Sequence, residues 1–136
     1  MPETQSTKLV VLGGGPGGYA AAFLAADRGV ETTLIDALPK PGGTCLHVGC
    51  IPSKALLHAA HVLHAAHDAA EFGITFAEPQ IDLAKLRAKK DKIVEMMTNS
   101  LLKGCKDRGI THVVGRGSFL DANTIQVENG PTVKFQ

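Results

Sequence analysis

The sequence has little of what nucleic-acid and membrane proteins depend on. It contains no tryptophan and one tyrosine, aromatic residues make up 4% of it, and its net charge is +1. It therefore offers few stacking side chains and no strong basic field for nucleic acid or an anionic membrane. The polar stretch Met1 to Thr7 carries no long apolar run, which argues against a secretory signal or a membrane anchor. These absences predict a soluble, cytoplasmic protein.

Cysteine is also scarce. Three cysteines are an odd, low number, unlike the dense and even sets of small secreted domains, so a purely structural disulfide framework explains them poorly. Two of them, Cys45 and Cys50, stand close together with four residues between them. In a reducing compartment such a pair indicates redox chemistry.

The first thirty-six residues have the pattern of a strand, a helix and a second strand. The apolar run at residues 8–12 predicts a buried parallel strand, the alanine-rich segment 16–28 a helix stopped by Gly29, and residues 32–36 the next strand. With 136 residues, the chain is long enough for one domain with its own core.

A glycine loop follows the first of these strands. Gly13, Gly15 and Gly18 form a Gly-x-Gly-x-x-Gly pattern that opens the helix, where a dinucleotide pyrophosphate would bind. Asp36 ends the next strand, near the roughly 20-residue spacing expected of an acid that hydrogen-bonds a ribose hydroxyl. The combination predicts a dinucleotide site that favours FAD or NAD over NADP.

The rest of the chain predicts two long helices and a small sheet. One helix is expected from near Pro52 to about Phe72, and a second from an Asp82 N-cap to Cys105 or Asp107. Strand-like segments follow at 112–115, 118–120, 124–127 and 132–135, with a turn at Asn129-Gly130. We expect one further strand of the parallel sheet and then an antiparallel meander.

The cysteine pair imposes its own geometry. A disulfide needs Cα atoms about 4.4–6.8 Å apart, so the segment between Cys45 and Cys50 must double back, and Gly49 makes such a turn easy. Cys50 is expected just before a helix, whose first amides can lower a thiol pKa. A thiolate at neutral pH is what exchange with a substrate disulfide requires.

The run from Gly42 to Lys54, GGTCLHVGCIPSK, resembles the flavoprotein disulfide reductase family. Its continuation, residues 51–57, is most similar to the dihydrolipoamide dehydrogenase members, and the likeness extends from about Lys8 to Gln136. His47 stands where that family usually has asparagine. The resemblance implies a Rossmann-type FAD-binding domain over residues 1–136 that is incomplete, with the nicotinamide and dimerisation domains absent.

The resemblance also implies roles. Cys45 would exchange with a dithiol substrate, Cys50 would lie against the flavin, and Lys54 would stabilise the reduced ring. The residues expected to meet FAD are Gly13, Gly15, Gly18, Asp36, Ala37, Gly42, Gly43, Thr44, Cys45, Lys54 and Gly117. The full-length enzyme would oxidise dihydrolipoyl groups on the acyltransferase of 2-oxoacid dehydrogenase complexes and reduce NAD+ as a homodimer. The 136 residues alone are expected to be inactive.

Two alternatives remain open at this stage. The chain could belong to another flavin disulfide reductase, of the mercuric or glutathione reductase type. It could also be a non-catalytic nucleotide- or metal-binding module, because His58, His61, His64 and His67 recur every third residue. That row drifts around a helix and has no evident carboxylate partner, so we expect no metal site. Cys105 is interpreted as a small buried hydrophobe.

Overall fold

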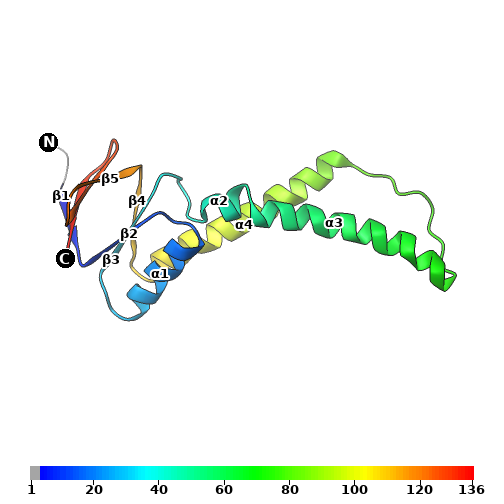
Figure 1. Cartoon of the computed structure of the whole chain (residues 1–136), viewed down its shortest axis with the longest axis horizontal. Coiled ribbons are helices and arrows are strands. Elements are labelled where there is room, and N and C mark those ends of the chain that lie inside the picture. Colours follow the sequence, from blue (N-terminus) through cyan, green and yellow to red (C-terminus); the bar gives the residue numbers. More distant parts are fainter. Residues whose placement is uncertain (1–3) are drawn as a thin grey trace.

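The computed structural model describes residues 4–136 as a sheet region with a helical arm extending from it (Figure 1). The three-stranded sheet contains β2 (Leu9–Leu12), β3 (Thr32–Asp36) and β4 (Thr111–Val114), all parallel, in the order β2-β3-β4. Helix α1 (Pro16–Asp27) connects β2 to β3. The predicted strand-helix-strand unit and its glycine stop are confirmed, with Gly29 in a left-handed conformation.

A second sheet lies beside the first. It combines β5 (Gly117–Asp121), β6 (Thr124–Val127) and β7 (Thr132–Phe135) as an antiparallel meander. The meander and its turn at Asn129, which has a positive φ, are confirmed. A strand that the sequence did not predict, β1 (Thr4–Thr7), pairs with β7 in parallel. Residues 1–3 of the polar N-terminal stretch lie outside the described residues.

The core has two layers, one on each face of the parallel sheet. Towards the second sheet, Ile35 and Val113 pack with Ile125, Val127 and Val133. On the opposite face, a second cluster joins the sheet to α1 and the end of α4 (Leu83–Asp107); its buried members are Ala22, Leu34, Cys105 and Ile110. All five residues of β3 are buried because the strand is central and covered on both faces. Cys105 is a core residue, as predicted.

His112 of β4 is a polar exception near this core. Its Nε2 is buried and has no hydrogen-bond partner within residues 4–136. Burial lowers the pKa of the imidazole, although the nearby Asp36 opposes that shift. The unfolded chain therefore binds this proton more readily than the folded chain does, so folding stability is lost as the pH falls below about 6.5, the ordinary histidine value.

Replacing His112 with leucine should flatten this pH dependence. At pH 7 the His112→Leu chain should be about as stable as the wild type, because the substitution removes an unpaired polar atom. Between pH 7 and pH 5, its free energy of unfolding in urea should fall less than that of the wild type. A His64→Leu chain is the control, since that imidazole is exposed. Equal acid losses in all three chains would contradict the assignment.

The arm consists of two helices joined by a long connection. Helix α3 (Cys50–Asp68) continues as a 3-10 turn, η1 (Ala69–Phe72), and stops at a left-handed Gly73, as predicted. Helix α4 begins where expected, because the Asp82 side chain accepts a hydrogen bond from the Lys85 amide at 2.9 Å. A short helix, α2 (Gly43–His47), precedes α3 and was not predicted.

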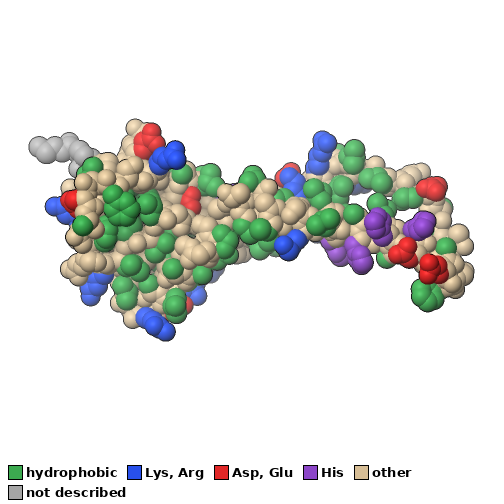
Figure 2. Space-filling view, in the orientation of Figure 1, with side chains coloured by type: hydrophobic (Ala, Val, Ile, Leu, Met, Phe, Trp, Pro, Cys, Tyr) green, Lys and Arg blue, Asp and Glu red, His purple; other side chains and the backbone are tan. Residues whose placement is uncertain are grey.

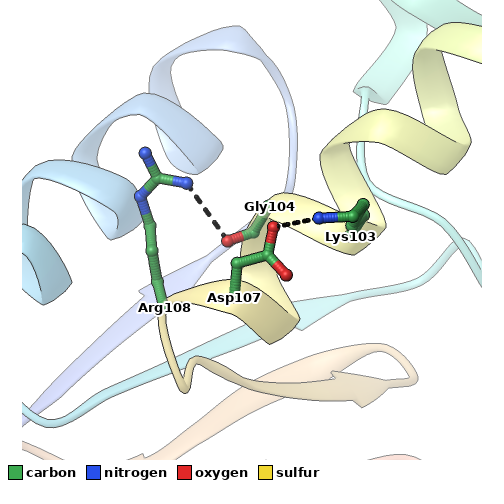
Figure 3. Close-up of polar contacts among 4 residues, drawn as sticks. All are labelled: Lys103, Gly104, Asp107 and Arg108. Carbon is green, nitrogen blue, oxygen red and sulfur yellow. Dashed lines mark hydrogen bonds and ion pairs between the residues drawn. The ribbon is translucent and has the colours of Figure 1, made fainter.

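Arg108 fixes the C-terminal end of α4 to α1. Figure 3 shows its contact with Gly104 and the neighbouring pair of Lys103 and Asp107. The Nη1 of Arg108 donates to the Gly104 carbonyl at 3.3 Å, its Nε donates to Asp27 at 3.0 Å, and its guanidinium lies 4.5 Å from the centre of the Phe23 ring. Lys103 pairs with Asp107 one turn away at 2.5 Å. The base of the arm is thus held to the sheet region.

The far part of the arm is thinly packed. None of the 19 residues of α3 is buried. The accessible surface of the chain is 9117 Å², whereas a compact protein of 14.3 kDa exposes roughly 6,800 Å². Figure 2 shows apolar and histidine side chains on this part of the arm. Among residues 4–136, no helix has the length and hydrophobicity needed to span a bilayer.

Candidate redox and dinucleotide site

The glycine loop occupies the turn between β2 and α1. The Gly13 amide donates to the Ile35 carbonyl at 2.8 Å, which ties the loop to β3. A Cβ atom on Gly18 would lie 1.8 Å from the Gly13 carbonyl oxygen, so only glycine allows α1 to start this close to the strand. No side chain caps α1 within the described residues, and its first turn contains no acidic residue. The positive end of this helix is therefore available to an anion.

Asp36 lies beside this loop, and backbone amides donate hydrogen bonds to both oxygens of its carboxylate. One oxygen accepts a hydrogen bond from the Gly14 amide and the other accepts one from the Leu38 amide at 2.7 Å. The side chain is 8% exposed. Sequence reasoning assigned Asp36 to a ribose and missed Gly14, because the second position of the glycine pattern is unrestricted and carries no signal. Each carboxylate oxygen has two lone pairs, so Asp36 can still accept from a ligand hydroxyl.

The segment after β3 returns to the glycine loop. The Gly42 amide donates to the Gly14 carbonyl at 2.7 Å. A Cβ atom on Gly43 would lie 2.6 Å from the Gly15 Cα, and both Gly42 and Gly43 have positive φ angles. The predicted Gly-Gly pair is therefore needed for close backbone contact and for a conformation that glycine adopts readily.

The remaining predicted residues divide into two groups. Ala37 and Thr44 flank this segment and are exposed, so both are accessible to a ligand. Gly117 starts β5, where a Cβ atom would lie 2.6 Å from Leu12, the last residue of β2. The geometry gives Gly117 a packing reason for being glycine. Its neighbour Gly115, which we did not include in the site, donates its amide to the Asp36 carbonyl at 2.8 Å.

The two cysteines lie on consecutive helices. Cys45 is in the middle of α2, half-buried, and Cys50 is the first residue of α3, exposed; both are free thiols. The chain doubles back between them as predicted, and Gly49 lies in this turn. A Cβ atom on Gly49 would lie 3.0 Å from the Thr44 carbonyl oxygen and 3.3 Å from the Cys45 Cα. Gly49 thus also provides space for the approach of the two helices.

The electrostatics of Cys45 depend on its neighbours. Hydrogen bonding to the Cys50 side chain raises the pKa of the Cys45 thiol, burial and the charge of Cys50 raise it further, and the Cys50 amide and the Lys54 ammonium oppose these effects. Lys54 lies one turn into α3, as predicted, and its charge acts to lower the pKa of Cys45.

Removing the Cys50 side chain should lower the pKa of Cys45. In a Cys50→Ala chain, the amide at position 50 and Lys54 still favour the thiolate, whereas the main opposing contact is gone. Alkylation of Cys45 by iodoacetamide at pH 7, followed by mass spectrometry, should be faster than in the wild type. A Lys54→Met chain should be alkylated more slowly. If Cys50→Ala left the pH profile of Cys45 unchanged, this account of the pair would be wrong.

An apolar pocket of about 310 Å³ adjoins Cys45. Pro16 and Tyr19 of α1 form one wall and Met97 and Leu101 of α4 another. Cys50 is not among its lining residues. The two cysteines therefore have different surroundings, because only Cys45 borders this apolar pocket.

The histidine row of α3 does not form a metal centre in the described part of the chain. His58, His61, His64 and His67 are all exposed, and His67 contacts the adjacent Asp68 at 3.4 Å. Within residues 4–136, no three His, Cys, Asp or Glu side chains are grouped so that they could hold a metal ion.

The comparisons with known proteins agree with this geometry. Residues 7–136 match the family model of the pyridine nucleotide-disulphide oxidoreductases. A dihydrolipoyl dehydrogenase of Vibrio parahaemolyticus is 47% identical over 94% of this chain and 27% of its own length. The one from Haemophilus influenzae is 45% identical over 99% and 29%, and the mitochondrial dihydrolipoyl dehydrogenase 1 of Arabidopsis thaliana is 45% identical over 88% and 24%.

The chain spans about a quarter of the length of the curated relatives that it matches. The family match spans the glycine loop at the carboxyl end of β2 and both Cys45 and Cys50. The chain belongs to the pyridine nucleotide-disulphide oxidoreductase family.

Proposed function

We propose that residues 1–136 are the N-terminal part of the FAD-binding domain of a dihydrolipoyl dehydrogenase. Cys45 and Cys50 are its dithiol–disulfide couple and pass electrons from a dihydrolipoyl substrate to FAD. The observation that carries the proposal is the placement of Cys45 and Cys50 on consecutive helices, α2 and α3, with Gly43 at the start of α2 packed against Gly15 of the glycine loop. The names of the relatives favour this reading over a mercuric or glutathione reductase.

The residues present fit FAD. The uncapped start of α1 suits a pyrophosphate, and Gly15 and Gly43 keep their side of the loop free of side chains. Asp36 would accept a hydrogen bond from the ribose, with Ala37, Thr44 and the Gly117 backbone nearby along the cofactor. When bound, the flavin would supply a two-electron acceptor for the pair of Cys45 and Cys50. Lys54, with its positive charge beside the pair, favours negative charge at that end of the site.

The chain's own residues handle the substrate side. The apolar pocket at Cys45 suits the hydrocarbon part of a lipoyl group, so Cys45 is the sulfur that exchanges with the substrate. The substrate thiolate attacks Cys45, the Cys45–Cys50 bond breaks, and Cys50 leaves as a thiolate. The second substrate thiol then displaces Cys45 and leaves oxidised lipoamide and a reduced pair.

The activity of the whole protein requires more than these residues. We propose that it reduces NAD+, that it receives electrons from the lipoylated acyltransferase of a 2-oxoacid dehydrogenase complex, and that it works in the cytoplasm. Residues 1–136 alone should not reduce NAD+ with dihydrolipoamide, because no nicotinamide site is evident beside the FAD loop in the described residues.

A flavin titration tests the proposal directly. The purified chain is titrated with FAD and, separately, with NAD+, and binding is followed by flavin fluorescence and by calorimetry. FAD should bind more tightly than NAD+. A Gly15→Ala chain should bind FAD at least about tenfold more weakly, which is a loss of about 1.4 kcal/mol. It should fold normally, because the added Cβ would lie 3.9 Å from Gly43. A folded chain that binds no flavin would contradict the proposal.

We further infer that α3 takes part in a homodimer. Lys54 and Asp68 are its only formally charged residues, whereas α4 carries many lysines. A groove of about 680 Å³, lined mostly by apolar residues of α3, η1 and segment 74–79, lies beside it. A surface with few charges can meet its own copy without repulsion, and interface cores are depleted of charge. The chain exposes more accessible surface than a compact protein of the same mass, and the difference is large enough for a stable interface.

Sedimentation tests this interface. The chain should associate reversibly, and Val62→Glu should abolish association, because the new carboxylate would lose its water in the interface. Lys89→Glu on α4 is the control and should associate like the wild type. Monomers at all concentrations, or equal loss in both variants, would exclude α3 as the dimer surface.

A further inference from the structure

His47 ends α2, the helix that carries Cys45, and lies between the two cysteines in the sequence. The helix has five residues and, within the described part of the chain, no side chain caps its start. A helix this short does not hold itself together in water, so its position depends on contacts with the rest of the chain. Leu46 supplies one of them by being buried.

A further contact comes from the His47 ring. Its Nε2 lies 3.0 Å from the carbonyl oxygen of Lys40, in a partly buried position. A carbonyl oxygen can only accept, so Nε2 carries the proton and donates it.

Lys40 belongs to a segment that is anchored on both sides. Before it, the Leu38 amide donates to the Asp36 carboxylate. After it, the Gly42 amide donates to the Gly14 carbonyl. The Lys40 carbonyl is therefore a fixed point beside the dinucleotide loop, and the His47 hydrogen bond closes a loop from Lys40 to His47 with Cys45 inside it.

We propose that His47 is a positioning residue for the Cys45–Cys50 couple: its Nε2–H holds the Lys40 carbonyl and so fixes α2, with Cys45, at the start of α3. The proposal rests on the redox role assigned above to this pair. His47 does not touch the sulfurs in this account. It acts by limiting the freedom of α2 when the two thiols are reduced.

The consequence is a change in how readily the disulfide forms. Oxidation by glutathione disulfide converts two protein thiols and one oxidant into the Cys45–Cys50 disulfide and two molecules of glutathione. Without the hydrogen bond from His47 to the Lys40 carbonyl, the reduced chain gains conformational freedom. Formation of the disulfide must then remove that freedom. A hydrogen bond contributes about 0.5–1.5 kcal/mol net, so the equilibrium constant for disulfide formation should fall by up to about tenfold.

Two substitutions separate the hydrogen bond from the bulk of the side chain. His47→Leu removes the donor, and His47→Gln retains an amide donor at a reach similar to Nε2. Both replacements are good helix formers, so neither should weaken α2 through helix propensity. Thermal unfolding of each chain checks that the fold is intact.

The readout is a redox titration of the chain in glutathione buffers, quenched with acid and digested with trypsin. Both cysteines fall in one peptide, residues 29–54, because Lys40 precedes a proline, so Cys105 does not interfere. His47→Leu should shift the midpoint towards easier reduction, by about 30 mV for a tenfold change. His47→Gln should restore it. Equal midpoints in wild type and His47→Leu, or equal shifts in both variants, would overturn the proposal. A wild-type chain with no Cys45–Cys50 disulfide in any buffer would instead reject the proposed function.

Discussion

The oxidised chain is expected to exchange with dihydrolipoamide, and replacing either Cys45 or Cys50 with serine is expected to abolish this reaction. The substrate must break a bond between two sulfurs, and a serine hydroxyl cannot replace either one in thiol–disulfide exchange. The measurement is the formation of lipoamide from dihydrolipoamide under nitrogen, with the thiols of peptide 29–54 counted by mass spectrometry. It needs neither flavin nor NAD+.

The third cysteine provides the matched control. Cys105 is 1% exposed in the core between α1, α4 and the sheet, and burial raises the pKa of its thiol. Cys105→Ala should lower stability slightly, by about 1 kcal/mol, and leave the exchange intact. Exchange that survives in Cys45→Ser, or that is lost in a folded Cys105→Ala chain, would show that the pair has been assigned wrongly.

Replacing Gly18 with alanine is expected to destabilise the chain by about 3 kcal/mol, a large fraction of the stability of a small domain. The new Cβ would lie 1.8 Å from the Gly13 carbonyl oxygen. Neither atom is at the end of a flexible side chain, so α1 must move away from β2, which also opens the turn that receives the pyrophosphate. Urea unfolding measures the loss, and FAD titration should show weaker binding.

Gly17 is the control one residue earlier. It lies in the first turn of α1, and a Cβ atom there would meet nothing within 4 Å. Gly17→Ala should therefore stabilise the chain by about 0.5–1 kcal/mol, because alanine loses less backbone entropy in a helix. Similar effects of the two substitutions would mean that the close approach of Gly18 to the Gly13 carbonyl does not require glycine at position 18.

Two elements, β1 and α2, were not predicted from the sequence. Strand β1 has the sequence TQST and no apolar alternation, and it exists because its backbone pairs with β7 at the other end of the chain. Helix α2 has five residues, too few for a periodic pattern, and is held by Leu46 and by the His47 contact with Lys40. Both depend on long-range or non-periodic contacts, which local patterns do not report.

Gly49 also has a role that the sequence does not show. A glycine between two cysteines suggests a turn, and Gly49 lies where the chain doubles back. A Cβ atom there would in addition lie 3.0 Å from the Thr44 carbonyl oxygen and 3.3 Å from the Cys45 Cα. Only the packing of α2 on α3 reveals this role. The hydrogen bond from the Gly14 amide to Asp36 likewise joins residues that are far apart in the sequence and meet only in the folded chain.

The sequence alone determined the strand-helix-strand unit, the glycine loop and the long helices, and it singled out Cys45 and Cys50 as the proposed redox pair, because these are set by local periodicity and by residue types that few other chemistries use. The tertiary structure decided how the pair is surrounded. It put Cys45 against an apolar pocket and Cys50 at a helix start, brought Lys54 into electrostatic range, and tied α2 to the dinucleotide loop through His47. These properties depend on distances between residues on separate elements, which only packing fixes.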